Sequence, residues 1–168
     1  QKDFEQLSEV EITDHAHENR NKEEALTVEF ANAEYLKQNR GGSLGESLKR
    51  LPGLSTIEIG SGQSKPVIRG LSFNRVVVVE NGIKHEGQQW GLEHGLEIDQ
   101  YGVSHVAIVK GPASLQFGSD AIGGVIDIHP AYFPKKNSLK VNLETNFKSN
   151  NLSYAASLNV EGRKDKLF

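Results

Sequence analysis

The stretch LKVNLETNFK, residues 139–148, alternates apolar and polar side chains over ten positions. After a short polar link, residues 151–161 (NLSYAASLNVE) repeat this alternation. A period of two is typical of β-strands, whose successive side chains point to opposite faces. Two consecutive strands of this length with one apolar face are typical of a membrane β-barrel wall, and a long hairpin of a soluble sandwich is the alternative. Because two strands cannot close a sheet, we expect them to begin a larger one.

Composition favours a folded domain over a fibre or a disordered chain. The 168 residues are 36% hydrophobic and 24% charged, with a net charge of −3 and no cysteine. A slightly acidic chain has no general attraction for phosphate backbones, so we expect no nucleic-acid partner. Without cysteine, disulfide scaffolds and thiolate metal sites are excluded within this sequence.

Glycine divides the chain into three zones. Sixteen of the 17 glycines lie between Gly41 and Gly124, and the 40 residues before them carry ten acidic and five basic side chains. Such an acidic zone without glycine or proline is typical of a solvated, mobile extension. It contains one alternating, β-prone segment that is suited to pair with the sheet edge of another protein. This segment consists of Glu9, Val10, Glu11, Ile12 and Thr13.

The middle zone predicts short helices and a small, interrupted sheet. Asn32 is placed to cap one helical turn, and the spacing of Ser43 and Glu46 predicts a capping box for a second helix, which Pro52 ends. Asn81-Gly82 is the strongest signal for a hairpin turn. Short β-prone runs are found at residues 56–59, 66–69, 76–80, 104–110 and 125–128. These elements predict an α+β fold.

The sequence offers no positive signal for catalysis or nucleotide binding. Residues 60–65 (GSGQSK) lack the spacing GxxxxGK[ST], and Pro66 stands where the helix of a phosphate-binding loop begins. Neither HExxH nor GxSxG occurs. We therefore expect a protein that is not an enzyme and requires no cofactor.

A glycine-rich loop, residues 85–97, gathers two histidines, three glutamates and the only tryptophan of the chain. Imidazole nitrogen and carboxylate oxygen suit zinc, nickel, copper or iron, and imidazole also ligates haem iron. The alternative is a polar loop that faces water, because no defined ligand spacing is met. The candidate residues for substrate or metal are His85, Glu86, Trp90, Glu93, His94 and Glu97.

Two cations, Arg69 and Lys110, end β-prone runs in apolar surroundings. Because an unpaired buried charge is costly, we expect each to be paired. For Lys110, exposure to solvent is the alternative, since its long stem can reach water.

Read in order, four motifs resemble the plug domain of TonB-dependent outer-membrane receptors. They are residues 45–53 (GESLKRLPG), 66–70 (PVIRG), 76–82 (VVVVENG) and 106–128 (VAIVKGPASLQFGSDAIGGVIDI), and the resemblance covers residues 25–130. The two alternating strands fall where this family begins its barrel of about 22 strands. The resemblance implies a small mixed-sheet plug with short helices, followed by the first two strands of a transmembrane β-barrel.

The resemblance also implies domains and roles. Residues 1–24 would be a mobile extension with the TonB box at residues 9–13, residues 25–134 the plug, and residues 135–168 the start of the barrel. The TonB box pairs with TonB, which works with an inner-membrane energising complex. Arg69 and Lys110 would ion-pair with carboxylates of the barrel wall, although the family usually has Arg at the second position.

The implied function is active import across the outer membrane of a Gram-negative bacterium, with the plug gating the barrel and the N-terminus in the periplasm. The expected cargo is a metal ion, metal chelate, haem or cobalamin, so a transition metal or haem is a transported ligand. Outer-membrane lipid would surround the barrel strands. The alternatives are import of oligosaccharide or peptide by the same machinery and a soluble binding module.

Overall fold

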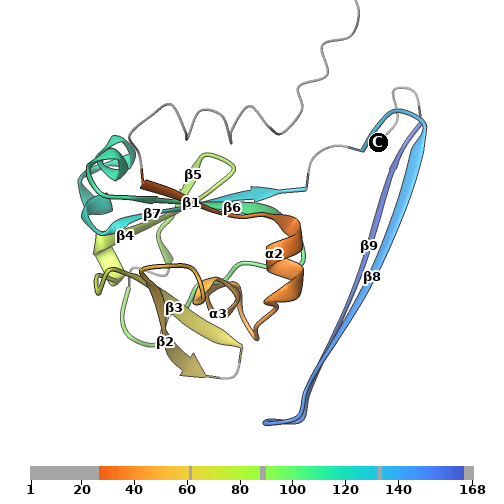
Figure 1. Ribbon diagram of the computed structural model, residues 1–168, viewed down its shortest axis with the longest axis horizontal. Coiled ribbons are helices and arrows are strands. Elements are labelled where there is room, and N and C mark those ends of the chain that lie inside the picture. The colour runs from red at the N-terminus through yellow and green to blue at the C-terminus, as the bar shows by residue number, and fades with distance from the viewer. Residues whose placement is uncertain (1–26, 61, 88–89, 132–133, 165–168) are drawn as a thin grey trace, which may run out of the picture.

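The computed structural model describes residues 27–60, 62–87, 90–131 and 134–164. The predicted TonB box and the extension that carries it lie outside the described residues. Residues 27–131 form a unit that we call the body, and residues 138–163 form the hairpin, which runs alongside the body in Figure 1.

A five-stranded mixed sheet forms the centre of the body. Its strands lie in the order β1-β6-β7-β4-β5, with β4 and β7 parallel and the other neighbours antiparallel. Their bounds are β1 Thr27–Ala31, β4 Val76–Glu80, β5 Ile83–His85, β6 Val103–Lys110 and β7 Gly124–Pro130. The arrangement confirms the predicted α+β fold with a small mixed sheet.

Two short helices and a separate two-stranded sheet cover one face of the main sheet (Figure 1). The Asn32 side chain accepts a hydrogen bond from the Tyr35 N–H at 2.9 Å, and Ser43 accepts one from the Glu46 N–H at 3.2 Å, so both predicted caps are confirmed. The elements are α2 Ala33–Gln38, α3 Leu44–Leu48, β2 Leu54–Gly60 and β3 Gln63–Ile68. Among the residues that the structure describes, the body also contains the 3₁₀ turns η1 Phe73–Arg75, η3 Pro112–Phe117 and η4 Ser119–Ile122.

Strand β4, which lies between β7 and β5, is buried on both faces. Val76 and Val78 face α2, α3 and β3, whereas Val77 and Val79 face η3 and η4. A strand covered on both faces needs a continuous apolar run, which explains the sequence VVVV at this position. Close packing also requires glycine at Gly124, where a Cβ would lie 2.9 Å from the Val109 carbonyl oxygen.

The hairpin consists of β8 Ser138–Lys148 and β9 Ser153–Arg163, paired antiparallel. Val141 lies opposite Val160 and Phe147 opposite Tyr154, so the apolar side chains share one face, which is exposed. β9 continues through Gly162 to Arg163, where Leu139 and Ser138 still pair with it. In the described part of the chain, no helix is both long and apolar enough to cross a membrane.

Candidate functional site

The contact between the body and the hairpin is built from charged and polar side chains. Arg40, which follows α2, donates from Nε to Glu144 Oε1 at 2.8 Å and from a terminal nitrogen to Oε2 at 3.1 Å. Its other terminal nitrogen donates to the Gln100 carbonyl at 2.7 Å, and the guanidinium lies 4.8 Å from the centre of the Tyr101 ring. The Arg40 and Glu144 side chains are only 8% and 14% exposed, so water screens this two-pronged ion pair weakly.

The chain around Arg40 is held in place by the amide of Gln100. This amide donates to the Gly41 carbonyl at 3.1 Å and accepts from the Ser47 hydroxyl at 2.9 Å. Gln100 and Ser47 are both buried, and buried polar groups are stable only when they are paired in this way. The network therefore fixes the turn between α2 and α3, which carries Arg40 at its start.

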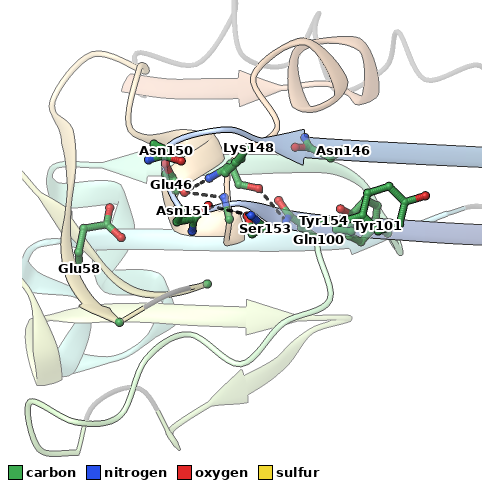
Figure 2. Close-up of a pocket in the computed structure, with 15 residues that line it drawn as sticks. Glu46, Glu58, Gln100, Tyr101, Asn146, Lys148, Asn150, Asn151, Ser153 and Tyr154 are labelled. Carbon is green, nitrogen blue, oxygen red and sulfur yellow. Dashed lines mark hydrogen bonds and ion pairs between the residues drawn. The ribbon is translucent and has the colours of Figure 1, made fainter.

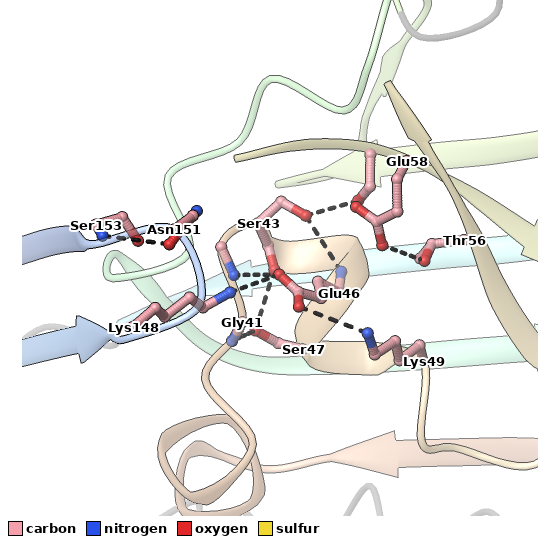
Figure 3. Close-up of polar contacts among 12 residues, drawn as sticks. Gly41, Ser43, Glu46, Ser47, Lys49, Thr56, Glu58, Lys148, Asn151 and Ser153 are labelled. Atoms are coloured by element: carbon pink, nitrogen blue, oxygen red, sulfur yellow. Dashed lines mark hydrogen bonds and ion pairs between the residues drawn. The ribbon is translucent and has the colours of Figure 1, made fainter. Parts of the chain in front are cut away.

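A second ion pair of opposite polarity joins α3 to the end of β8. Lys148 Nζ lies 2.8 Å from Glu46 Oε2 (Figure 3). The hydrogen bond from Lys148, a second from the Gly42 N–H and the nearby charge of Lys49 lower the pKa of Glu46 to about 2, although burial opposes them. The capping box is thus altered, since the Glu46 carboxylate accepts from Gly42 rather than from Ser43.

A cavity of about 300 Å³ lies between these contacts, where the hairpin approaches the body (Figure 2). Glu144 and Lys148 lie four residues apart on the face of β8 that meets the body, with Asn146 between them. Both ion pairs therefore come from one strand face. The cavity is lined by Gly41, Gly42, Glu46, Glu58, Gly60, Gly62, Gln100, Tyr101, Asn146, Lys148, Asn150, Asn151, Ser153, Tyr154 and Ala155. Such walls can bind water or polar groups.

The predicted cargo loop, residues 85–97, places its candidate side chains mostly in solvent. Trp90 is 68% exposed, and His85 is half-buried at the end of β5. The other four candidates are also exposed: Glu86, Glu93, His94 and Glu97. Across the described residues, no three His, Asp or Glu side chains are grouped closely enough to hold a metal ion. Metal binding by this loop stays a prediction.

One residue beside this loop, Lys65, was missed by the sequence reasoning. It lies on β3, is 0% exposed, and donates from Nζ to the carbonyls of Trp90 at 2.9 Å and Gly91 at 2.7 Å. Burial lowers the pKa of Lys65, and the charge of Glu93 opposes that effect. Lys65 is the last residue of the motif GSGQSK, whose spacing excludes a nucleotide-binding loop, and no local pattern connects Lys65 to residues 25 positions away.

Arg69 and Lys110, the two cations that we expected to be paired, differ in their surroundings. Arg69 is exposed, and its N–H donates to the Gly53 carbonyl at 2.8 Å. The Lys110 side chain is 3% exposed, donates to the Pro52 carbonyl and lies 3.6 Å from Glu29 Oε1. Lys110 is therefore paired inside the body, and the alternative of an exposed Lys110 is wrong. Pairing of either cation with a barrel carboxylate stays a prediction.

Comparison with known proteins places the fold in a family. The model of the TonB-dependent receptor plug domain matches residues 20–125, and this chain belongs to that family. A vitamin B12 transporter, BtuB of Photobacterium profundum, is 33% identical over 100 residues, which are 59% of this chain and 16% of the relative. The chain thus spans about one sixth of the length of that curated relative.

Solved structures of receptors share the fold. The ferric enterobactin receptor PfeA of Pseudomonas aeruginosa, in complex with enterobactin, matches with a TM-score of 0.64 and 18% identity, covering 83% of this chain and 23% of the receptor. The hemophore receptor HasR of Serratia marcescens, in complex with its hemophore HasA and haem, matches with a TM-score of 0.68 and 19% identity, covering 84% and 23%. The match to a receptor plug family and the curated relative, a transporter, confirm the expectation that the chain is not an enzyme.

Proposed function

We propose that this chain forms the plug and the first two barrel strands of an outer-membrane transporter that imports a metal chelate, haem, cobalamin or metal ion. The plug-family match over residues 20–125 carries this proposal. The named cargoes of relatives, vitamin B12, enterobactin and haem, favour this class over oligosaccharide or peptide import. They are large ligands that carry or capture a metal.

The different surroundings of the two hairpin faces support the proposal that β8 and β9 belong to a barrel wall. Its apolar face has no cover in the described structure, and its polar face meets the body through Arg40–Glu144 and Glu46–Lys148. Barrel strands alternate in this sense, with apolar side chains toward lipid and polar ones toward the lumen. A soluble binding module would instead leave a broad apolar surface in water, which is unfavourable. We therefore assign the exposed face to outer-membrane lipid.

Coupling to TonB would act on the body through its first strand. The predicted TonB box precedes β1, and β1 is an edge strand that pairs only with β6 within the described sheet. An edge strand has one row of hydrogen bonds to lose, and single hydrogen bonds contribute only about 1 kcal/mol each. Tension on the N-terminus would therefore release β1 before the inner strands β7 and β4.

Replacement of Ile12 by proline in the full-length receptor tests this coupling. Proline cannot donate to a strand ladder, so Ile12→Pro should abolish energised uptake and leave cargo binding at the cell surface unchanged. Asn19→Pro, in the same extension but outside the predicted box, is the matched control and should transport normally. Loss of surface binding in Ile12→Pro would mean that residues 9–13 have a structural role instead.

The cargo class is tested by competition binding to the full-length receptor. The ligands to compare are cyanocobalamin, haemin, ferric enterobactin, transition-metal salts and oligosaccharides. We expect a member of the first four groups to compete best. Tight binding of oligosaccharide alone would refute the cargo class and leave the family unchanged.

If His85 and His94 contact a metal or haem, then replacing both by Ala should weaken uptake of that cargo; unchanged uptake would refute the role of the loop in metal binding.

A further inference from the structure

Lys65 is a buried cation whose side chain contacts the predicted cargo loop and the ring of Phe73. It is among the largest fully buried side chains of the described structure. Its Nζ donates to the carbonyl oxygens of Trp90 and Gly91, and it lies 4.2 Å from the centre of the Phe73 ring. Lysine is rarely buried to this extent without compensation. Here two carbonyl dipoles and the face of an aromatic ring compensate the ammonium.

Ser64, the residue before Lys65, contacts the C-terminal end of the same loop. The Ser64 carbonyl accepts from the Leu96 N–H at 2.9 Å. Gly95 packs directly on Ser64, since a Cβ at Gly95 would lie 3.3 Å from that carbonyl oxygen. Two adjacent residues of β3 therefore fix the loop at two places, one through a side chain and one through the backbone.

The segment between these two anchors faces outward. Trp90 and Leu92 are 68% and 65% exposed, and Glu93 and His94 are exposed beside them. Exposed aromatic and aliphatic side chains next to a carboxylate and an imidazole suit a ligand that combines apolar surface with polar or metal groups. Holding the backbone in one position reduces the entropy that such a segment loses when a ligand binds.

We propose that Lys65 is a positioning residue for cargo recognition: its ammonium fixes the backbone at Trp90 and Gly91, so that the segment 90–94 is presented to the cargo in one preformed conformation. This inference rests on the proposed function, because it assigns the segment to cargo contact. Lys65 itself is covered and acts only through the loop.

The test uses the full-length receptor with Lys65→Met, which keeps an unbranched apolar stem and removes the donors. Lys65→Arg retains a cation with donors, and Lys37→Met, at an exposed position of α2, is the matched control. A spin label on Leu92→Cys reports mobility of the segment without any cargo. We expect Lys65→Met to make the label clearly more mobile, Lys65→Arg to restore at least part of the immobilisation, and Lys37→Met to change nothing.

Cargo affinity is measured on the same variants with cyanocobalamin, haemin and ferric enterobactin. For the probe that the unmodified receptor binds, Lys65→Met should weaken affinity about tenfold, with partial recovery in Lys65→Arg. An unchanged label in Lys65→Met overturns the positioning role. A mobile label with unchanged affinity overturns the assignment of the segment to cargo contact. If no probe binds even the unmodified receptor, the label alone decides whether Lys65 positions the loop, and the competition binding described above decides the cargo class.

A second variant covers the case in which Lys65→Met does not fold. Phe73→Leu removes the ring beside the ammonium and leaves both carbonyl contacts possible. It should increase the mobility of the label by a smaller amount than Lys65→Met. A label as immobile as in the unmodified receptor would then count against the proposal.

Discussion

The body buries its apolar side chains, whereas the hairpin exposes them. Val76, Val77 and Val78 in the body are 0% exposed, whereas Leu143 and Phe147 in the hairpin are 69% and 64% exposed. The body thus completes its own core between α2, α3, η3 and η4, while the apolar face of the hairpin has no partner within the described residues. The two regions share a chain but are stabilised in different surroundings.

The body and the hairpin are joined by polar contacts. Arg40–Glu144 and Glu46–Lys148 cross the contact, with a polar cavity between them. Ion pairs and hydrogen bonds are individually modest and can be exchanged for water, unlike a packed apolar seam. In the transporter proposed above, a contact of this kind would let the plug stay in place at rest and separate from the barrel wall during transport.

The largest expected effect comes from placing a charge in each region. Val78→Asp would bury an unpaired carboxylate, so we expect it to cost more than about 4 kcal/mol and prevent the body from folding. Leu143→Asp, at a 69% exposed position on the face assigned to lipid, should leave the core of the body intact and instead destabilise the barrel wall, because a carboxylate that faces lipid is unfavourable. Calorimetry and protease resistance of the full-length receptor in detergent measure both. An equal loss in the two variants would mean that Leu143 belongs to the same core as Val78.

An intermediate effect is expected from the ion pair that joins the regions. Arg40→Glu would set two carboxylates together, and Glu144→Arg two guanidinium groups, so each should destabilise the receptor. The double variant restores opposite charges, so the two changes should couple by about 1–3 kcal/mol. Recovery should be incomplete, because the Gln100 carbonyl and the Tyr101 ring lose their cation. Denaturant unfolding of the four proteins measures the coupling, and purely additive losses would show that the pair does not join the regions.

The smallest effect is a dependence on pH at Glu46. Its pKa in the folded chain is about 2, below the usual value, so the stabilisation is complete above about pH 5 and is lost as the pH falls toward 2. Because the pair is partly solvated, we expect about 1 kcal/mol, and Glu46→Gln should flatten this part of the stability profile. Lys49→Ala is the control, since Lys49 is 46% exposed and 3.5 Å from Glu46, and its effect should stay within about 0.5 kcal/mol. An unchanged acid profile in Glu46→Gln would rule out this pair as the source.

The features that could be predicted from the sequence are those set by near neighbours. Asn32 and Ser43 cap their helices as expected, since a cap needs a partner only three residues away. Asn81 and Gly82 both have positive φ, as the expected hairpin turn requires. The motif order also predicted the plug family, which the family match confirms.

The features that could not be predicted depend on residues far apart in the chain. Arg40 meets Glu144 across 104 positions, and both are ordinary charged residues in their local sequence. Lys110 was expected to be exposed or to be paired with a barrel carboxylate, and it lies inside the body near Glu29, because β1 and β6 are neighbours in the sheet. For the 85–97 loop, the sequence left open whether the candidate side chains face water, as most of them do, and it did not predict the hydrogen bonds from Lys65 to this loop.

By itself, then, the sequence determined the helix caps, the hairpin turn and the alternating faces of β8 and β9, because backbone geometry and local hydrogen bonds act over a few residues. Only the tertiary structure decided which face of β8 meets the body, which charges pair across the contact, and which lysines are buried. Those outcomes depend on how distant segments share space and exclude water, and no local pattern records that.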